Sequence, residues 1–166
     1  MCDTYILRLS QHHAQQLIEH LYPGDGKEAV AIAACSYERK PAEGLFDIHE
    51  VLPIPLDRCI SRSRCLVQWA VADIEDFIVV QTGLERVISV FHSHPNGAPC
   101  FSHQDDIADR SFRTELTDTF GTKSPLISAI MLPDTTMRAR IIHEQGGFSI
   151  VDEVRVLPIN APTTTL

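Results

Sequence analysis

The segment from residue 91 to residue 105 gathers side chains that proteins use to hold a catalytic metal ion. It reads Phe-His-Ser-His-Pro-Asn-Gly-Ala-Pro-Cys-Phe-Ser-His-Gln-Asp. Residues two apart in a strand point to one face, so His92 and His94 project together where an apolar strand ends. Asp105 follows at the start of a helix. Two imidazoles and a carboxylate can fill three corners of a tetrahedron. A catalytic zinc keeps the fourth corner for a water, whose pKa it lowers to about 7.

Ser102 has two interpretations. The pattern Ser102-x-x-Asp105 is typical of a helix capping box, in which both side chains bind backbone N–H groups. The same serine also lies within a larger set, because His-x-His precedes it by seven residues. A capping box alone arises often by chance. The His-x-His pair followed by Ser-x-x-Asp is much less often accidental, so the whole set favours a metal site.

These residues resemble the signature of the JAMM metalloproteases, a family also called JAB or MPN-plus. His92, His94, Ser102 and Asp105 match His-x-His-x7-Ser-x-x-Asp, and Pro95 also matches. The resemblance implies one zinc ion per chain, held by the two histidines and the aspartate. It further implies that the serine stabilises the oxyanion of a tetrahedral intermediate, where charge develops only in the transition state.

The family also uses a glutamate as general acid/base, at the start of the strand before the central hairpin. Glu28 stands there, directly before Ala-Val-Ala-Ile. Glu38 and Glu43 lie near the far end of that strand, and nine residues at about 3.3 Å each put the former near 30 Å away. Glu50 lies in the returning strand and is the real competitor. The resemblance therefore implies that Glu28 exchanges the proton.

The elements around this segment alternate between strands and helices. Helical spacing predicts helices at 11–22, 73–81 and 102–120, with Ser10 and Asp73 as caps of the first two. Apolar and β-branched runs predict strands at 5–9, 29–37, 46–54, 65–69, 87–91, 126–132, 137–144 and 148–157, and the polar stretch 56–64 is predicted to be irregular.

Packing these elements predicts an α/β domain of the layered α+β kind. We expect a central mixed, mostly antiparallel sheet flanked by two or three helices. The resemblance implies the fold shared by JAMM proteins and cytidine deaminases. Residues 1–158 are expected to form one domain, and residues 159–166 a flexible C-terminal tail.

Composition excludes several functional classes. The chain has 166 residues, 44% of them hydrophobic, and 14 Lys+Arg against 22 Asp+Glu give a net charge of −8. Nucleic-acid binding depends on Lys and Arg displacing counterions, so no nucleic-acid partner is expected. No apolar run is long enough to span a membrane and no signal peptide is evident. Five cysteines, none in Cys-x-x-Cys spacing, favour reduced thiols and a cytoplasmic location.

The resemblance implies a zinc-dependent isopeptidase or peptidase that cleaves after the C-terminal glycine of a ubiquitin-like protein. Such cleavage would remove the modifier from its conjugates or process its precursor. Small bacterial JAMM proteins are encoded beside ubiquitin-like conjugation enzymes, some of which act in phage defence. Two alternatives remain open: processing of a sulfur-carrier protein's C-terminus, and a catalytically silent scaffold, which the complete ligand set disfavours. The sequence leaves open the oligomeric state.

Overall fold

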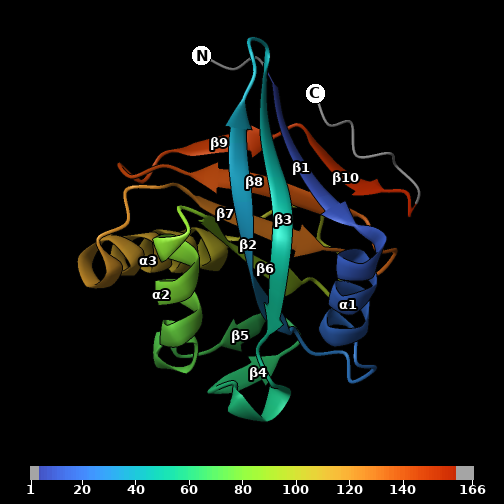
Figure 1. Ribbon diagram of the computed structural model, residues 1–166. Coiled ribbons are helices and arrows are strands. Elements are labelled where there is room, and N and C mark those ends of the chain that lie inside the picture. The colour runs from blue at the N-terminus through green and yellow to red at the C-terminus, as the bar shows by residue number, and fades with distance from the viewer. Residues whose placement is uncertain (1–3, 160–166) are drawn as a thin grey trace.

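Eight strands form one mixed sheet in the computed structural model, which describes residues 4–159 (Figure 1). Their order across the sheet is β10-β1-β3-β2-β6-β7-β8-β9, and four of the seven neighbouring pairs are antiparallel. The strands are β1 (Thr4–Ser10), β2 (Val30–Arg39), β3 (Glu43–Pro53), β6 (Val87–Ser93), β7 (Leu126–Met131), β8 (Met137–Ile142), β9 (Phe148–Val151) and β10 (Glu153–Leu157).

Three helices and a small hairpin complete the described chain. The helices are α1 (Gln11–Leu21), α2 (Glu75–Gly83) and α3 (His103–Phe120). The hairpin pairs β4 (Ser61–Ser63) with β5 (Leu66–Gln68), and short 3-10 turns lie at Leu56–Arg58 and Val71–Ile74. The predicted combination of a mixed sheet with three helices is confirmed in this coarse form. No helix within residues 4–159 is long and apolar enough to cross a membrane.

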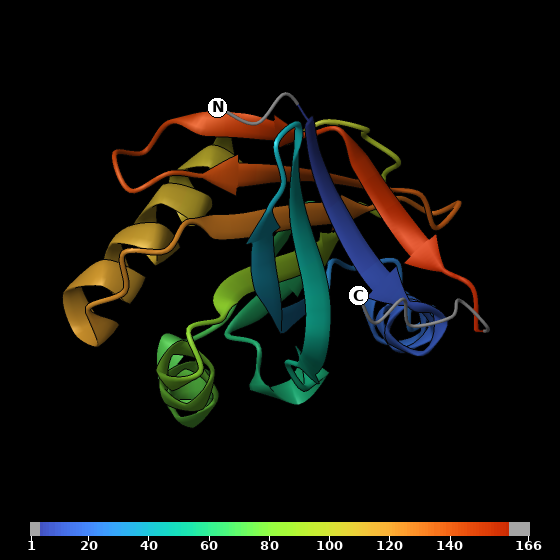
Figure 2. The ribbon, with the colours of Figure 1, turned by 45° about the horizontal axis from the view of Figure 1, so that its top comes forward.

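The sheet curves strongly, so the layered arrangement predicted from the sequence is better described as nearly barrel-like (Figure 2). Its two end strands, β9 and β10, follow each other along the chain with only Asp152 between them. The Asp152 N–H donates to the Tyr5 carbonyl at 2.8 Å, and the Tyr5 N–H donates to Asp152 Oδ2 at 2.7 Å. The single strand predicted at 148–157 is therefore wrong, because the chain changes partner from β8 to β1 at this aspartate.

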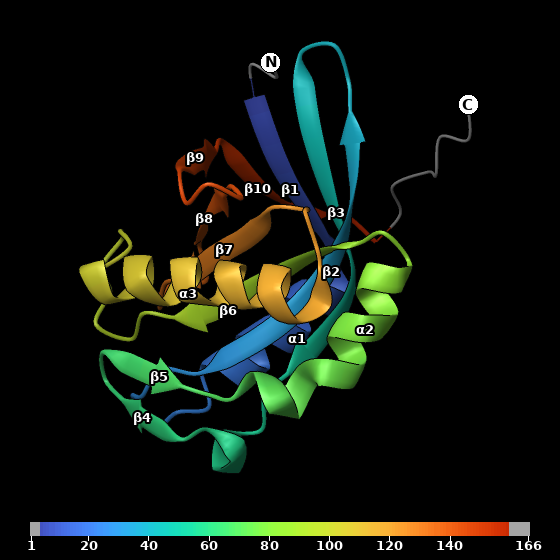
Figure 3. The ribbon, with the colours of Figure 1, turned by 90° about the vertical axis from the view of Figure 1, so that its left-hand side faces the viewer.

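Helices cover both faces of the sheet, with α1 on one side and α2 and α3 on the other (Figures 1 and 3). Alternation along β2 separates the two cores. Ala29, Ala31 and Ala33 belong to the α1 side, whereas Val30 and Ile32 pack with the residues of α2 and α3. In β6, Val90 belongs to the α2–α3 side, so His92 two residues later faces α3 as well.

The predicted N-cap residues of α1 and α3 are confirmed, and the one predicted for α2 is wrong. Ser10 caps α1 by accepting the His13 N–H at 3.1 Å, and Ser102 caps α3. Asp73, the predicted cap of α2, instead lies inside a 3-10 turn, and Ile74 precedes the helix without any side-chain cap. The predicted irregular stretch 56–64 contains β4, whose partner β5 agrees with the strand predicted at 65–69.

Replacing Asp152 with alanine is expected to lower the free energy of unfolding by about 1 kcal/mol, because Tyr5 loses its acceptor at the junction of the two sheet ends. Asp152→Asn is the matched control, since its amide oxygen can still accept this hydrogen bond. Urea unfolding measures both variants. Equal stability of Asp152→Ala and wild type would mean that this contact does not hold the sheet ends together.

Candidate metal centre

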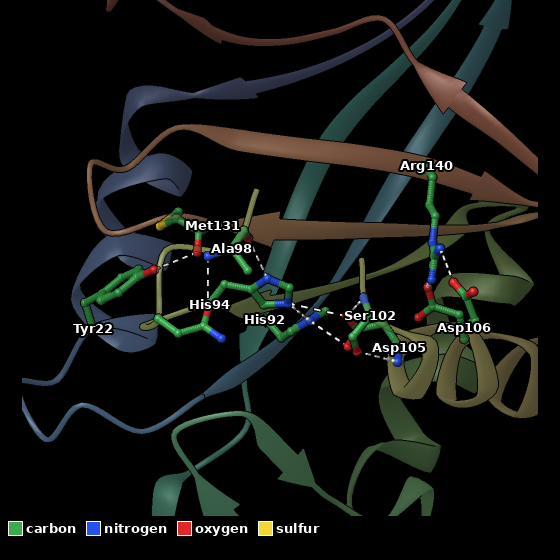
Figure 4. A network of polar contacts seen from close by, with 11 residues as sticks. Tyr22, His92, His94, Ala98, Ser102, Asp105, Asp106, Met131 and Arg140 are labelled. Atoms are coloured by element: carbon green, nitrogen blue, oxygen red, sulfur yellow. Dashed lines mark hydrogen bonds and ion pairs between the residues drawn. The ribbon is translucent and has the colours of Figure 1, made fainter. Parts of the chain in front are cut away.

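His92, His94 and Asp105 meet where β6 ends and α3 begins (Figure 4). The two histidine Nε2 atoms lie 2.9 Å apart. Asp105 reaches both of them, with Oδ1 at 3.1 Å from His92 Nε2 and Oδ2 at 3.4 Å from His94 Nε2. Both histidines are buried. These three side chains converge on one point and could bind a metal ion.

Backbone carbonyls orient His94. Its Nδ1 lies 2.9 Å from the Ala98 carbonyl oxygen, to which an Nδ1–H donates, and this arrangement leaves Nε2 for a metal. The His94 N–H donates to the Met131 carbonyl at 3.0 Å. That same carbonyl accepts the Tyr22 hydroxyl at 2.6 Å, and burial raises the pKa of Tyr22 to about 12. The backbone of His94 is therefore fixed from β7, and its imidazole is oriented by the loop that follows β6.

Ser102 and Asp105 form the capping box that the sequence predicts. Ser102 Oγ accepts the Asp105 N–H at 3.1 Å, and Asp105 Oδ2 accepts the Ser102 N–H at 2.6 Å. Burial by itself raises the pKa of Asp105, but hydrogen bonds from His92 and His94 outweigh it and hold this pKa well below its ordinary value. The helix cap thus fixes the carboxylate in its ionised form beside the histidines.

Glu28 lies beside the same site because of the register between β2 and β6. Val30 is paired with His92, and the Ser93 N–H donates to the Ala29 carbonyl at 3.1 Å. Continuing this antiparallel register places Glu28 opposite His94, on the same face of the sheet. The residue is only 5% exposed, and burial raises its pKa to about 7 although the two histidines lower it.

The competing glutamates lie elsewhere. Glu50 is paired with Ala34, six residues beyond Glu28 along β2, and accepts a hydrogen bond from Gln81 of α2 at 2.6 Å. Six residues of strand span about 20 Å. Glu38 and Glu43 lie still farther along, near the turn between β2 and β3. Of the four glutamates, Glu28 is the one that the structure brings to the histidines.

Arg62 holds the backbone of Glu28, a role that the sequence did not indicate. Its Nε donates to the Glu28 carbonyl at 2.8 Å, and its Nη1 forms a 2.8 Å ion pair with Asp25. Ser63 accepts the Glu28 N–H at 2.8 Å. Arg62 falls in the stretch 56–64 that the sequence predicts to be irregular, but it lies in β4 and its guanidinium is bound by the protein itself. The neighbouring Arg-Ser-Arg sequence gives no sign of it, because the partners lie more than thirty residues upstream.

A cleft of about 470 Å³ opens beside the metal ligands. Glu28, His92 and Asp105 are among its lining residues, and residues of the β4–β5 hairpin and of α3 also line it (the two elements are seen in Figure 3). Its walls combine polar and acidic residues with apolar side chains, among them Leu66, Val67, Trp69 and Phe112. The cleft gives a ligand access to the side chains that could hold a metal.

No protein-family model and no curated protein matches this chain. The fold is similar to the solution structure of a structural-genomics target from Desulfitobacterium hafniense, with a TM-score of 0.59. The two proteins are 14% identical, and the alignment covers 91% of this chain and 92% of the other. At this identity the likeness extends to the fold alone.

Glu28→Gln is expected to gain stability relative to wild type as the pH rises in metal-free protein. The Glu28 pKa is about 7 in the folded chain, against an ordinary value of 4.5. The folded wild type therefore keeps a proton that the unfolded chain releases, and its stability falls as pH rises between these two values. Glutamine carries no such proton. Urea unfolding of chelator-treated protein between pH 5 and 8 measures the difference, which should grow with pH; a constant difference would contradict it.

Proposed function

We propose that this protein is a zinc-dependent isopeptidase of the JAMM type, which cleaves after the C-terminal glycine of a ubiquitin-like protein. One observation carries the proposal: a buried glutamate with a pKa of about 7 lies beside two histidines and an aspartate that converge on one point. Metal ligands alone would suit a structural site. A proton-exchanging carboxylate beside them, in the lining of an open cleft, favours hydrolysis.

The spacing of the candidate ligand groups is compatible with zinc. Bonds of about 2.0–2.1 Å in a tetrahedron separate neighbouring ligand atoms by about 3.3 Å. Here the two imidazole Nε2 atoms lie 2.9 Å apart, Asp105 Oδ1 lies 3.1 Å from His92 Nε2, and the other carboxylate oxygen, Oδ2, lies 3.4 Å from His94 Nε2. Two imidazole nitrogens and one carboxylate oxygen leave a fourth position open, as catalytic zinc sites do. Zinc bound there would supply an acidified water and would polarise the scissile carbonyl.

Glu28 exchanges the proton of the reaction. A general acid/base works best with a pKa near the working pH, and burial brings this carboxyl to about 7. It can therefore take a proton from the attacking water and return it to the leaving amine. Arg62 and Ser63 hold its backbone in place from β4, so the carboxyl stays near the ligands during both transfers.

Ser102 stabilises negative charge on the substrate oxygen. Its Oγ accepts the Asp105 N–H, and a hydroxyl carries one proton of its own to donate. No residue described in the structure accepts that proton. The capping role and the oxyanion role are therefore compatible, because they use the acceptor and the donor of the same hydroxyl.

The cleft suits an extended peptide tail. β5 pairs only with β4 among the described strands, so its other edge keeps unpaired backbone groups. An added peptide strand can use such an edge for main-chain hydrogen bonds. Leu66 and Val67 from β5 and Phe112 from α3 offer apolar contacts along the same cleft. A narrow diglycine end preceded by larger residues fits this combination.

Glu28→Gln is expected to lower the turnover of zinc-loaded protein by about 10²–10⁴-fold, because the amide keeps the shape but loses the exchangeable proton. Substrates are ubiquitin-like and sulfur-carrier proteins that are extended beyond their C-terminal glycine, and mass spectrometry identifies the products. Bound zinc, measured by metal analysis, should stay near one ion per chain.

Glu50→Gln is the matched control for Glu28→Gln, since it makes the same change about 20 Å along the sheet. Its turnover should equal that of wild type. A collapse of turnover in Glu50→Gln with normal turnover in Glu28→Gln would contradict the assignment of the general base. Absence of cleavage of every extended substrate by zinc-loaded wild type would contradict the proposed function.

Ser102→Ala and Ser10→Ala separate helix capping from catalysis, because each removes the N-cap of one helix. Both should lose about 1 kcal/mol of stability. Only Ser102→Ala should also lose about 10²–10³-fold in kcat, the cost of one oxyanion donor. Ser102→Thr, which keeps the hydroxyl, should recover much of it. Unchanged kcat in folded Ser102→Ala would leave Ser102 as a cap only.

A further inference from the structure

Arg140 of β8 is a buried cation that forms ion pairs with the beginning of α3. It is 8% exposed. Its Nε and Nη2 donate to Asp109 Oδ2 at 3.0 and 2.6 Å. Its Nη1 donates to Asp106 Oδ1 at 2.5 Å (Figure 4). Both aspartates lie in the first two turns of the helix, one and four residues after Asp105. Arg140 thus joins the central part of β8 to the helix that carries Asp105.

The same guanidinium also contacts the loop before α3. Its Cζ lies 3.8 Å from the centre of the Phe101 ring and 4.2 Å from that of Phe148. Phe101 immediately precedes the Ser102 cap, and its ring packs edge-on against His92, with the ring centres 6.5 Å apart. Arg140 therefore holds the chain on both sides of Asp105, through Phe101 before it and through two aspartates after it.

Three aspartates compete for any cation at this helix start. Asp105 and Asp109 are four residues apart and lie on one face of α3, with Asp106 beside them. Arg140 occupies the two that are not needed as ligands. This pairing also offsets two negative charges that would otherwise repel the Asp105 carboxylate in a low-dielectric setting.

We propose that Arg140 is a positioning residue of the metal centre. It fixes the first turns of α3 against β8 so that Asp105 reaches His92 and His94, and it withholds Asp106 and Asp109 from the metal ion. The inference rests on the proposed metal site. It goes beyond the ligand set, because Arg140 lies on a different strand and contacts none of the three ligands through a hydrogen bond.

Arg140→Met tests this role, with Arg110→Met as the matched control. Arg110 also stacks on Phe148, at 4.4 Å, but its Nε donates to the Gly146 carbonyl and to neither aspartate. Zinc affinity is measured by chelator competition, and the absorption spectrum of the Co²⁺-loaded protein reports ligand geometry. Arg140→Met should bind zinc about 10–100-fold more weakly, the usual cost of losing a group that orients a ligand, with an altered Co²⁺ spectrum. Arg110→Met should match wild type.

Asp106→Ala is a second variant, which tests the same role if Arg140→Met fails to fold. Asp106 is partly exposed, so its loss should be tolerated, yet it removes the attachment next to Asp105. We expect several-fold weaker zinc binding. Unchanged affinity and spectrum in the folded variants, with only thermal stability lowered, would make Arg140 a structural residue and overturn the inference. Wild type that binds no zinc, or binds it equally well after His94→Ala, would instead overturn the metal site and the proposed function.

Discussion

The candidate site depends on one pairing, the antiparallel register between β2 and β6. Val30 lies opposite His92, and this register carries Glu28 to the end of β6 where the histidines are. A slip of one residue would turn every side chain of one strand to the other face. Ser93 opposes such a slip, because its buried Oγ accepts the Ala29 N–H at 2.9 Å while its own N–H donates to the Ala29 carbonyl. Ser93, which lies between the two histidines, therefore stabilises the β2–β6 register that places Glu28 beside them.

Electrostatics then divide two nearby carboxyl groups into different roles. Burial raises the pKa of Glu28, which has no cation paired with its carboxyl among the described ion pairs. Asp105 is partly buried, and its hydrogen bonds from the two histidines and from the Ser102 N–H lower its pKa. Neighbouring acids whose environments push their pKa values apart are typical of acid/base chemistry. Here one carboxyl suits a ligand and the other suits proton exchange.

The sequence predicted what short-range patterns encode. The ligand trio and the Ser102 cap follow from one continuous segment, and the β-branched run at 87–91 predicts β6 correctly. Asp73 failed as a cap because a 3-10 turn extends past it, and the strand at 148–157 failed because Asp152 joins a distant partner. The sequence did not predict the contacts of three further residues for a similar reason; these are Arg62, Tyr22 and Arg140. Each acts through residues more than thirty positions away, so no local spacing reveals it.

Asp105 also changes how strongly its neighbour His94 binds a proton. Burial lowers the pKa of His94, but the Asp105 carboxylate and the Ala98 carbonyl outweigh burial and leave this pKa raised. Asp105 therefore makes His94 hold a proton more tightly, whereas only a neutral imidazole can be a metal ligand. A metal ion held by His94 would compete with that proton, so its affinity would depend on pH. The hydrogen bond from Nδ1 to Ala98 is compatible with both states, because it uses the nitrogen that faces away from Asp105. The ring can keep its orientation while its Nε2 exchanges a proton for a metal ion.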